Sequence, residues 1–167
     1  TLAQLVTLED SSCTILNCTF PSIQNNELLH FLNMPPGGHA LIASNLFGTP
    51  GIPATSGYND IIDFTGGNRP GPIVEFIGNT FLSAVDDVFD MDGTDAHIEG
   101  NIFLNVRQDA QRDSGSYPIT TGANGSDLSQ LVVCRNILYD CEHTLLIKEH
   151  GSMLVQKEKG GLYNNDE

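Results

Sequence analysis

The sequence predicts an all-β protein built as a solenoid, and three observations lead to this prediction. A short motif centred on Asn returns five times along the 167 residues. The segments that precede its copies are apolar runs of strand length, too short for helices. Turn-forming residues are frequent, with 17 Gly and 8 Pro. A repeat with a period of a few tens of residues is typical of solenoids, in which each coil stacks on the next.

The repeated motif ends in Phe or Leu in every copy. The copies are Asn17–Phe20, Ser44–Phe47, Gly78–Phe81, Gly100–Phe103 and Arg135–Leu138. The shortest interval between their asparagines is 22 residues, about one turn of a three-stranded β-helix. Longer intervals indicate loop insertions, which solenoids tolerate because each coil contacts only its neighbours. We therefore predict a right-handed parallel β-helix of about five or six coils. The expected inner stacks are Asn45, Asn79, Asn101 and Asn136, beside Phe47, Phe81, Phe103 and Leu138.

A second strand can be aligned between coils by its acidic residues. The segments of similar shape are Glu27–Leu32, Asp60–Gly66, Asp87–Gly93 and Thr144–Glu149. Stacking them in register places Asp60 beside Asp87, at a strand spacing of about 4.8 Å. The same register places Asp63 beside Asp90. The sequence therefore predicts that carboxylates of successive coils lie side by side.

Composition and charge limit the possible functions. The length suits one domain, and we expect the solenoid to span residues 1–155, with a polar tail at 156–167. The formal net charge of −14, from 21 acidic and 7 basic residues, repels nucleic acid and favours cations. No apolar run reaches the ~18–20 residues of a membrane span. The first residues lack the basic start and cleavage site of a signal peptide, so we expect a piece of a longer solenoid, with possible end-to-end or lateral contacts to other chains.

The four cysteines leave two interpretations open. The spacings of Cys13 to Cys18 and of Cys134 to Cys141 match neither a zinc knuckle nor a redox pair. They permit two local disulfides in a secreted protein. Free buried thiols that pack as small apolar side chains are the alternative.

The Gly-Asn-Xaa-Phe coils and the Asp-Asp-Val-Phe-Asp strand at 86–90 resemble the pectate-lyase-like superfamily of right-handed parallel β-helices. The resemblance covers about Ser11 to Val155. Within it, Asp86, Asp87 and Asp90 are similar to calcium-binding acids of one pectate lyase family, with Asp60 and Asp63 one coil earlier. In that family calcium bridges the uronate carboxylate and a lysine removes the C5 proton.

The chain also resembles a second group of proteins, and it departs from the pectate lyase pattern at two residues. The string at 90–103 also resembles β-helical modules of large bacterial surface proteins, which implies a secreted or cell-surface location. The family's lysine has no obvious counterpart, and Lys148 is the internal candidate. The arginine that would steady the substrate carboxylate has only Arg107 and Arg112 as candidates.

The candidate site residues follow from the chemistry of oxygen ligands. Calcium takes six to eight oxygens, and close carboxylates raise one another's pKa unless a cation neutralises them. We predict a Ca2+ site at Asp63, Asp86, Asp87 and Asp90, with Asp87 and Lys148 as the catalytic residues. The alternative for the acids is that outward Asp side chains in turns face water. The alternative for Lys148 is a surface ion pair with Glu149, and Asp92 and Asp95 are expected to be turn residues.

Other chemistries receive less support from the sequence. The five histidines show no zinc-ligand spacing such as HExxH. Glycoside hydrolysis by two carboxylates among the four predicted calcium ligands stays open. Three functions are therefore considered. The first is an extracellular domain that acts on or binds acidic polysaccharide, with a calcium-dependent lyase as its enzymatic form. The others are a non-catalytic carbohydrate-binding or adhesion module and a spacer of a large surface protein.

Overall fold

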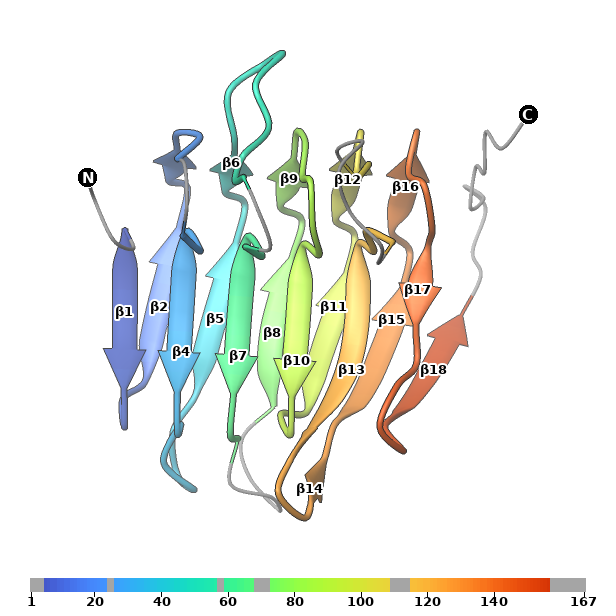
Figure 1. Ribbon diagram of the computed structural model, residues 1–167. Helices are drawn as coiled ribbons and strands as arrows, with labels where there is room; N and C mark the ends of the chain where they lie inside the picture. The colour runs from blue at the N-terminus through green and yellow to red at the C-terminus, as the bar shows by residue number, and fades with distance from the viewer. Residues whose placement is uncertain (1–4, 24–25, 57–58, 68–72, 109–114, 157–167) are drawn as a thin grey trace.

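The structure, a computed structural model, describes residues 5–23, 26–56, 59–67, 73–108 and 115–156. Within these ranges every regular element is a β-strand, and the strands form three sheets (Figure 1). Named strands pair in parallel, except that β13 (Ile119–Asn124) also pairs with the antiparallel β14 (Asp127–Leu128). The predicted all-β class is confirmed, and the arrangement is compatible with a parallel β-helix.

Each coil contributes one strand to each of the three sheets. The front sheet contains β1 (Val6–Glu9), β4 (Leu29–Leu32), β7 (Ile62–Thr65), β10 (Phe89–Asp92), β13 with β14, and β17 (Leu145–Leu146). The rear sheet contains β2 (Cys13–Leu16), β5 (Ala40–Ala43), β8 (Val74–Ile77), β11 (Ala96–Glu99), β15 (Gln130–Cys134) and β18 (Ser152–Gln156). The short sheet contains β3 (Thr19–Phe20), β6 (Leu46–Phe47), β9 (Thr80–Phe81), β12 (Ile102–Leu104) and β16 (Ile137–Tyr139). In the described part of the chain five coils reach all three sheets, and β17 and β18 follow them.

The strands form because apolar and polar side chains alternate along them. In β10, Phe89 and Met91 point inward and are fully buried, whereas Asp90 and Asp92 lie on the outer face. This period of two is typical of strands with one face on a core. The alternation breaks just before β7 and β10, where Ile61 and Val88 are also fully buried. At these bends the chain turns inward, which explains the unbroken apolar pairs in the sequence.

The core contains a continuous stack of aromatic rings below the short sheet. The rings of Phe20, Phe47, Phe81 and Phe103 lie face to face, with successive centroids 4.7, 4.7 and 5.2 Å apart. These distances are close to the spacing of neighbouring strands, about 4.8 Å. Leu138 continues the row and is buried. The predicted apolar ladder is confirmed, and it arises because parallel pairing in register superposes equivalent residues.

A ladder of buried asparagines lies at the bend before the short sheet. The Oδ1 of Asn79 accepts hydrogen bonds from the backbone N–H and the side-chain amide of Asn45, both at 3.0 Å. Asn101 accepts the same pair from Asn79, and Asn136 accepts it from Asn101. Each amide of the last three asparagines also donates to a strand carbonyl, as Asn101 does to Phe76 at 2.8 Å. The predicted stack of these four residues is confirmed.

The first copy of the motif departs from the prediction by one residue. Cys18 occupies the ladder position, and its backbone N–H donates to Asn45 Oδ1 at 2.8 Å. Asn17 instead occupies the preceding position, where the chain takes a left-handed conformation with φ of 54°. The equivalent residues of the later coils are also left-handed, and they are Ser44, Gly78, Gly100 and Arg135. Gly and Asn tolerate this conformation best, so an Asn suits either position and the sequence alone did not distinguish them.

The register of the front sheet agrees with the sequence alignment in its first coils. Asp63 pairs with His30 on one side and with Asp90 on the other, as predicted. The alignment of the last copy is wrong by one residue, because Leu145 rather than Leu146 corresponds to Phe89 through Ile119. The intervening strand β13 carries Thr where the earlier coils carry Asp, so no acidic pattern revealed it.

Three further predictions concern the cysteines, the tail and the membrane. None of the four cysteines is in a disulfide, and Cys134 and Cys141 are buried, as expected of small apolar side chains. Strand β18 ends at Gln156, and the rest of the predicted polar tail lies outside the described residues. Within the described part of the chain, no helix has the length and apolar character needed to cross a membrane.

The phenylalanine stack predicts the effect of a core substitution. Phe103→Ala should lower the free energy of unfolding by ~3–5 kcal/mol, because it removes a fully buried ring and leaves a cavity. Ile137→Ala on the same sheet is the control, since Ile137 is exposed and should change stability by less than about 1 kcal/mol. Urea unfolding measures both variants. Equal losses in the two would contradict the assignment of this row to the core.

Candidate carboxylate site

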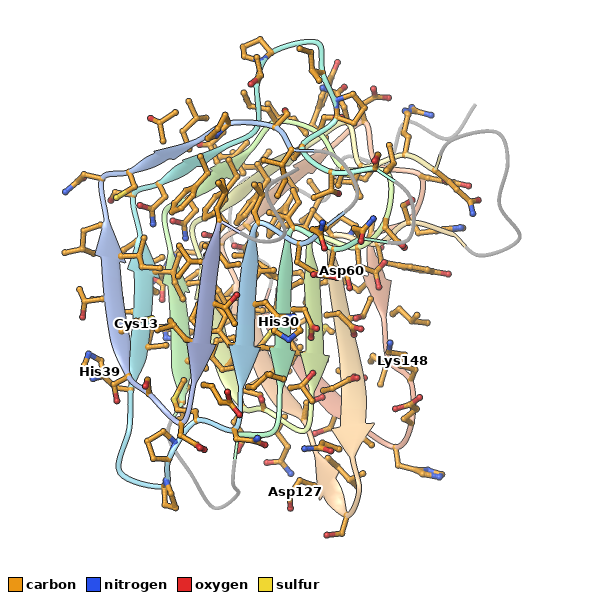
Figure 2. The ribbon with its side chains drawn as sticks, turned by 60° about the vertical axis from the view of Figure 1, so that its left-hand side comes forward. Cys13, His30, His39, Asp60, Asp127 and Lys148 are labelled. Atoms are coloured by element: carbon orange, nitrogen blue, oxygen red, sulfur yellow. The ribbon has the colours of Figure 1, made fainter. Side chains whose placement is uncertain are left out.

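The outer face of the front sheet carries most of the predicted site residues. We call it the acidic face and define it by Asp60, Asp63, Asp86, Asp87, Asp90, Asp92 and Lys148. Figure 2 shows Asp60, His30 and Lys148 along this sheet, with Asp60 nearer the end at which its strands begin. The parallel register places Asp63 next to Asp90. Equivalent acidic positions of adjacent coils therefore lie one strand spacing apart.

Three carboxylates come together at the bends that precede β7 and β10. One oxygen from each of Asp60, Asp86 and Asp87 lies within 4.8 Å of the other two. We call these residues the carboxylate triad. The bends are held in place because the backbone N–H of Ile61 donates to the carbonyl of Asp87 at 3.1 Å. Asp87 is buried, whereas Asp60 and Asp86 are partly exposed.

Burial and neighbouring charges raise the pKa values of two triad members, Asp60 and Asp87. The pKa of Asp60 lies well above its ordinary value, because of burial first and then the charges of Asp90, Asp87, Asp86 and Asp63. Burial raises the pKa of Asp87 to about 7, although the Tyr117 backbone N–H, 2.9 Å from its Oδ1, acts in the opposite direction. A cation bound among these carboxylates would take the place of the protons that burial favours on them.

Asp63 and Asp90 lie beside the triad but have partners of their own. Asp63 Oδ2 lies 3.1 Å from His30 Nδ1, and its Oδ1 accepts a hydrogen bond from Thr65 at 3.0 Å. Burial still raises the pKa of Asp63, while the His30 charge and the Thr65 bond lower it. Asp90 Oδ1 accepts from the Thr120 hydroxyl at 2.8 Å and lies 3.1 Å from Lys148 Nζ. Two of the four predicted calcium ligands are thus engaged by polar side chains, and Asp60 joins the other two.

Lys148 reaches the acidic face from two coils beyond the acids. Strand spacing alone separates these positions by roughly 10 Å, and the long side chain spans this distance to Asp90. The alternative pairing with Glu149 is not adopted, since Glu149 accepts from the Ala123 backbone N–H at 2.9 Å. Burial lowers the pKa of Lys148, but the charge and hydrogen bond of Asp90, with Asp92 and Asp87, raise it above its ordinary value overall. The lysine is therefore held as a cation.

Asp92 is a strand residue of the acidic face, and its prediction as a turn residue is wrong. It follows Asp90 by two positions in β10 and pairs with Thr65 and Gly122. The Asp92 carboxylate lies over Gly122, where a Cβ would be 1.6 Å from Asp92 Oδ1, so a side chain at this position would displace the carboxylate. Burial, followed by the charge of Asp90, raises the Asp92 pKa to about 6. The alternation of Asp90, Met91 and Asp92 is the sequence signal that could have placed it.

Two aromatic side chains next to the triad were not found from the sequence. The rings of Tyr117 and His143 stack with centroids 4.7 Å apart and an interplanar angle of 16°. Tyr117 contacts Asp87 through its backbone. They come from successive coils in which the acidic pattern has ended, so no motif marked them. Stacked rings beside carboxylates offer a flat apolar surface next to charged groups.

The remaining predicted residues lie elsewhere or outside the described ranges. Arg107 forms an ion pair with Asp140, and Arg112 lies outside the described residues. Asp95, also expected in a turn, precedes β11 and accepts a hydrogen bond from the Gln130 backbone at 2.9 Å. Neither described residue belongs to the acidic face.

Fold and site define a class of protein: an all-β chain of three stacked parallel sheets with carboxylates gathered on one outer face. Comparison with models of protein families, with curated proteins and with solved structures found no match. The chemistry of this face is therefore the basis on which a function can be inferred.

The raised pKa of Asp87 predicts a pH dependence of stability in the presence of a chelator. The unfolded chain releases this proton near the ordinary value of 3.8, whereas the folded chain keeps it up to about pH 7. The stabilisation is complete below 3.8 and is lost as pH rises to about 7. The difference corresponds to about 4 kcal/mol at about 1.4 kcal/mol per pH unit.

The measurement is thermal or urea unfolding between pH 5 and pH 7.5. The wild type should become less stable as pH rises, and Asp87→Asn should flatten this slope, because the amide cannot ionise and its oxygen still accepts from Tyr117. Asp127→Asn, on the hairpin of β13 and β14, is the control and should keep the full slope. A slope that Asp87→Asn leaves unchanged would refute the assignment.

Proposed function

We propose that this protein is a right-handed parallel β-helix of the pectate-lyase-like kind that acts on or binds acidic polysaccharide outside the cell, through calcium held by the carboxylate triad. The observation that carries the proposal is the convergence of three carboxylates within 4.8 Å, two of them with raised pKa values. The right-handed sense is supported by Figure 1, where front strands run downward and rear strands upward as the chain advances to the right.

The donor set of the triad fits calcium. Three carboxylates offer up to six oxygens, and Ca2+ takes six to eight, with waters completing the shell. The predicted ligands Asp86 and Asp87 belong to this set. Asp63 and Asp90 flank it and contribute negative charge, while Asp60 supplies the third carboxylate. A divalent ion would replace the protons that burial, and then the neighbouring charges, favour on Asp60 and Asp87.

The charge of the protein favours a bridging cation over direct contact with the glycan. At a net charge of −14, the protein repels a polyanion at long range. An ion between the triad and a uronate carboxylate removes this repulsion at the point of contact. The Tyr117–His143 stack lies beside the triad and offers an apolar surface to the sugar ring. Acidic polysaccharide is therefore the proposed ligand.

The lyase form of the proposal assigns a role to each polar group. Bound calcium would neutralise the uronate carboxylate and make its C5 proton more acidic. Asp60, Asp86 and Asp87 would hold the ion, and Lys148 would take the C5 proton as general base. The C4–C5 double bond would form as the glycosidic C4–O bond breaks, and the leaving oxygen would take a proton from solvent. Asp90 positions the lysine amine at 3.1 Å from its Oδ1. Charge neutralisation at Asp87 also lowers the pKa of Lys148, because the Asp87 carboxylate helps to raise it.

A non-catalytic binding, adhesion or spacer module is the second candidate. The observation that favours it is the raised pKa of Lys148, because a lysine held as a cation is a poor base. Such a module needs the calcium triad and the ring stack but no proton acceptor. The two candidates therefore share the ligand and differ in the role of Lys148.

Calcium should stabilise the fold if the triad binds it. Melting is measured with a chelator and with millimolar Ca2+, and a hundredfold excess over Kd should add ~2.7 kcal/mol to the free energy of unfolding. Asp87→Asn should abolish the gain, and Asp127→Asn should preserve it. Identical melting of the wild type with chelator and with calcium would remove the cation from the proposal.

Products from a panel of acidic polysaccharides distinguish the catalytic outcomes. A lyase gives unsaturated uronates that absorb in the ultraviolet, whereas a hydrolase gives reducing ends without this absorbance, with Asp87 as the candidate acid. In the lyase case, Asp87→Ala should abolish both activity and the calcium effect. Lys148→Ala should lower the rate by about 10²–10⁴ while the calcium effect survives. A fully active Lys148→Ala variant would clear this lysine of the role, and binding without product would support the second candidate.

A further inference from the structure

A second cluster of potential metal ligands lies on the rear sheet, away from the acidic face. His97 and Glu99 occupy alternate positions of β11, so both side chains leave the same face of the strand. Cys134 of β15, in the next coil, pairs in register with Glu99. Histidine, carboxylate and thiol donors thus meet on two adjacent strands, and their donor atoms all lie within 4.8 Å of one another.

The distances within this cluster are close to those of a tetrahedral metal site. The His97 Nε2 atom lies 3.6 Å from Cys134 Sγ, and Glu99 Oε2 lies 3.7 Å from the same sulfur. Zn2+ bound tetrahedrally at its usual bond lengths separates a sulfur from a nitrogen or oxygen ligand by about 3.6 Å. The Nε2 and Oε2 atoms lie 2.9 Å apart, and would separate to about 3.4 Å around the ion.

The direction of the contacts argues against a catalytic relay. In a Cys–His–acid triad, the thiol and the carboxylate contact different ring nitrogens of the histidine. Here Cys134 and Glu99 both approach Nε2 of His97. Three donors that converge on one point match the requirement of a metal ion, which accepts several lone pairs at once.

The surroundings of the cluster orient the ligands and leave access for an ion. Arg135 pairs with Glu99 through Oε1, so the other carboxylate oxygen, Oε2, faces His97 and Cys134. Such outer contacts fix a ligand's orientation in metal sites. Cys134 is buried, whereas His97 is about one-third exposed and lines a groove of about 530 Å³. Solvent therefore reaches the cluster from the histidine side.

We propose that His97, Glu99 and Cys134 form a Zn2+ site with three protein ligands and an open fourth position. The mixed set of thiolate, imidazole and carboxylate favours Zn2+ over the hard cations Ca2+ and Mg2+, which take oxygen ligands. An open position taken by water is the arrangement of catalytic rather than structural zinc. No zinc motif marks these ligands in the sequence, because strand pairing brings Glu99 and Cys134 together across 35 residues and no local spacing does so.

The first test is metal binding by the full chain, stripped with chelator and kept reduced. Zn2+ titrated against a chromophoric chelator should bind with one equivalent at sub-micromolar Kd, and Ca2+ and Mg2+ should not compete. Co2+ in the same protein should give a thiolate charge-transfer band and the intense visible bands of tetrahedral coordination. Absence of a stoichiometric Zn2+ site in the wild type would overturn the proposal, whatever the variants do.

Substitutions then assign the ligands. Cys134→Ser should remove the charge-transfer band, and His97→Gln and Glu99→Gln should each weaken Zn2+ binding by more than tenfold. Cys141→Ser is the matched control, because this second buried free thiol lies outside the cluster. Arg135→Gln should retain the band and lose about tenfold in affinity, because Arg135 contacts the ligand Glu99 and not the ion.

Binding that is equally tight in Cys134→Ser would refute the site. Loss of the band in Cys141→Ser, with the band kept in Cys134→Ser, would refute it as well. Asp87→Asn should bind Zn2+ as the wild type does, because the carboxylate triad belongs to the other sheet.

Discussion

The structure depends on one constraint: parallel pairing in register places equivalent residues of successive coils one strand spacing apart. A residue type that interacts favourably with an identical residue about 4.8 Å away therefore gains such a contact in every coil. Phenylalanine gains ring stacking, and asparagine gains two hydrogen bonds per step. The asparagine oxygens also accept hydrogen bonds from the buried backbone N–H groups at the bend. Without these acceptors the N–H groups would be buried and unpaired, which is costly.

The same constraint becomes unfavourable when the repeated residue is charged. The register makes Asp63 and Asp90 neighbours, so their negative charges repel each other. Each carboxylate is stabilised by different partners: Asp63 by His30, and Asp90 by Thr120 and Lys148. At the bend, burial together with the neighbouring charges raises the pKa values of Asp60 and Asp87 instead. The acidic face is thus a consequence of the stacking that stabilises the core. Within the described part of the chain, Asp60 and Asp87 of this face lack an ion-pair partner, and a bound cation would stabilise them.

The sequence predicted the parts of the fold that repeat and failed where repetition stops. The Asn and Phe ladders, and the pairing of Asp63 with Asp90, followed from recurring letters. The coil of β13 was missed because Thr120 and Gly122 stand where β10 has Asp90 and Asp92, and this shifted the alignment of Leu145. Asp60, Asp86 and Asp87 were all recognised, but their closeness depends on the shape of the bend. The Tyr117–His143 stack and the His97–Glu99–Cys134 cluster join residues of different types across coils, so no periodicity marks them.

The asparagine ladder also has a direction. Each side-chain oxygen accepts from the coil before it, and the backbone N–H groups of Asn45, Asn79 and Asn101 donate to the coil after them. The amide dipoles therefore point the same way, and each polarises the next. A coil can join this chain in only one orientation, and it must bring its own asparagine or another acceptor. The natural unit of insertion, deletion or duplication is thus a whole turn from one asparagine to the next. After such a change, the asparagine amide on one side of the junction still donates to the asparagine Oδ1 on the other side, so the row of hydrogen bonds stays continuous.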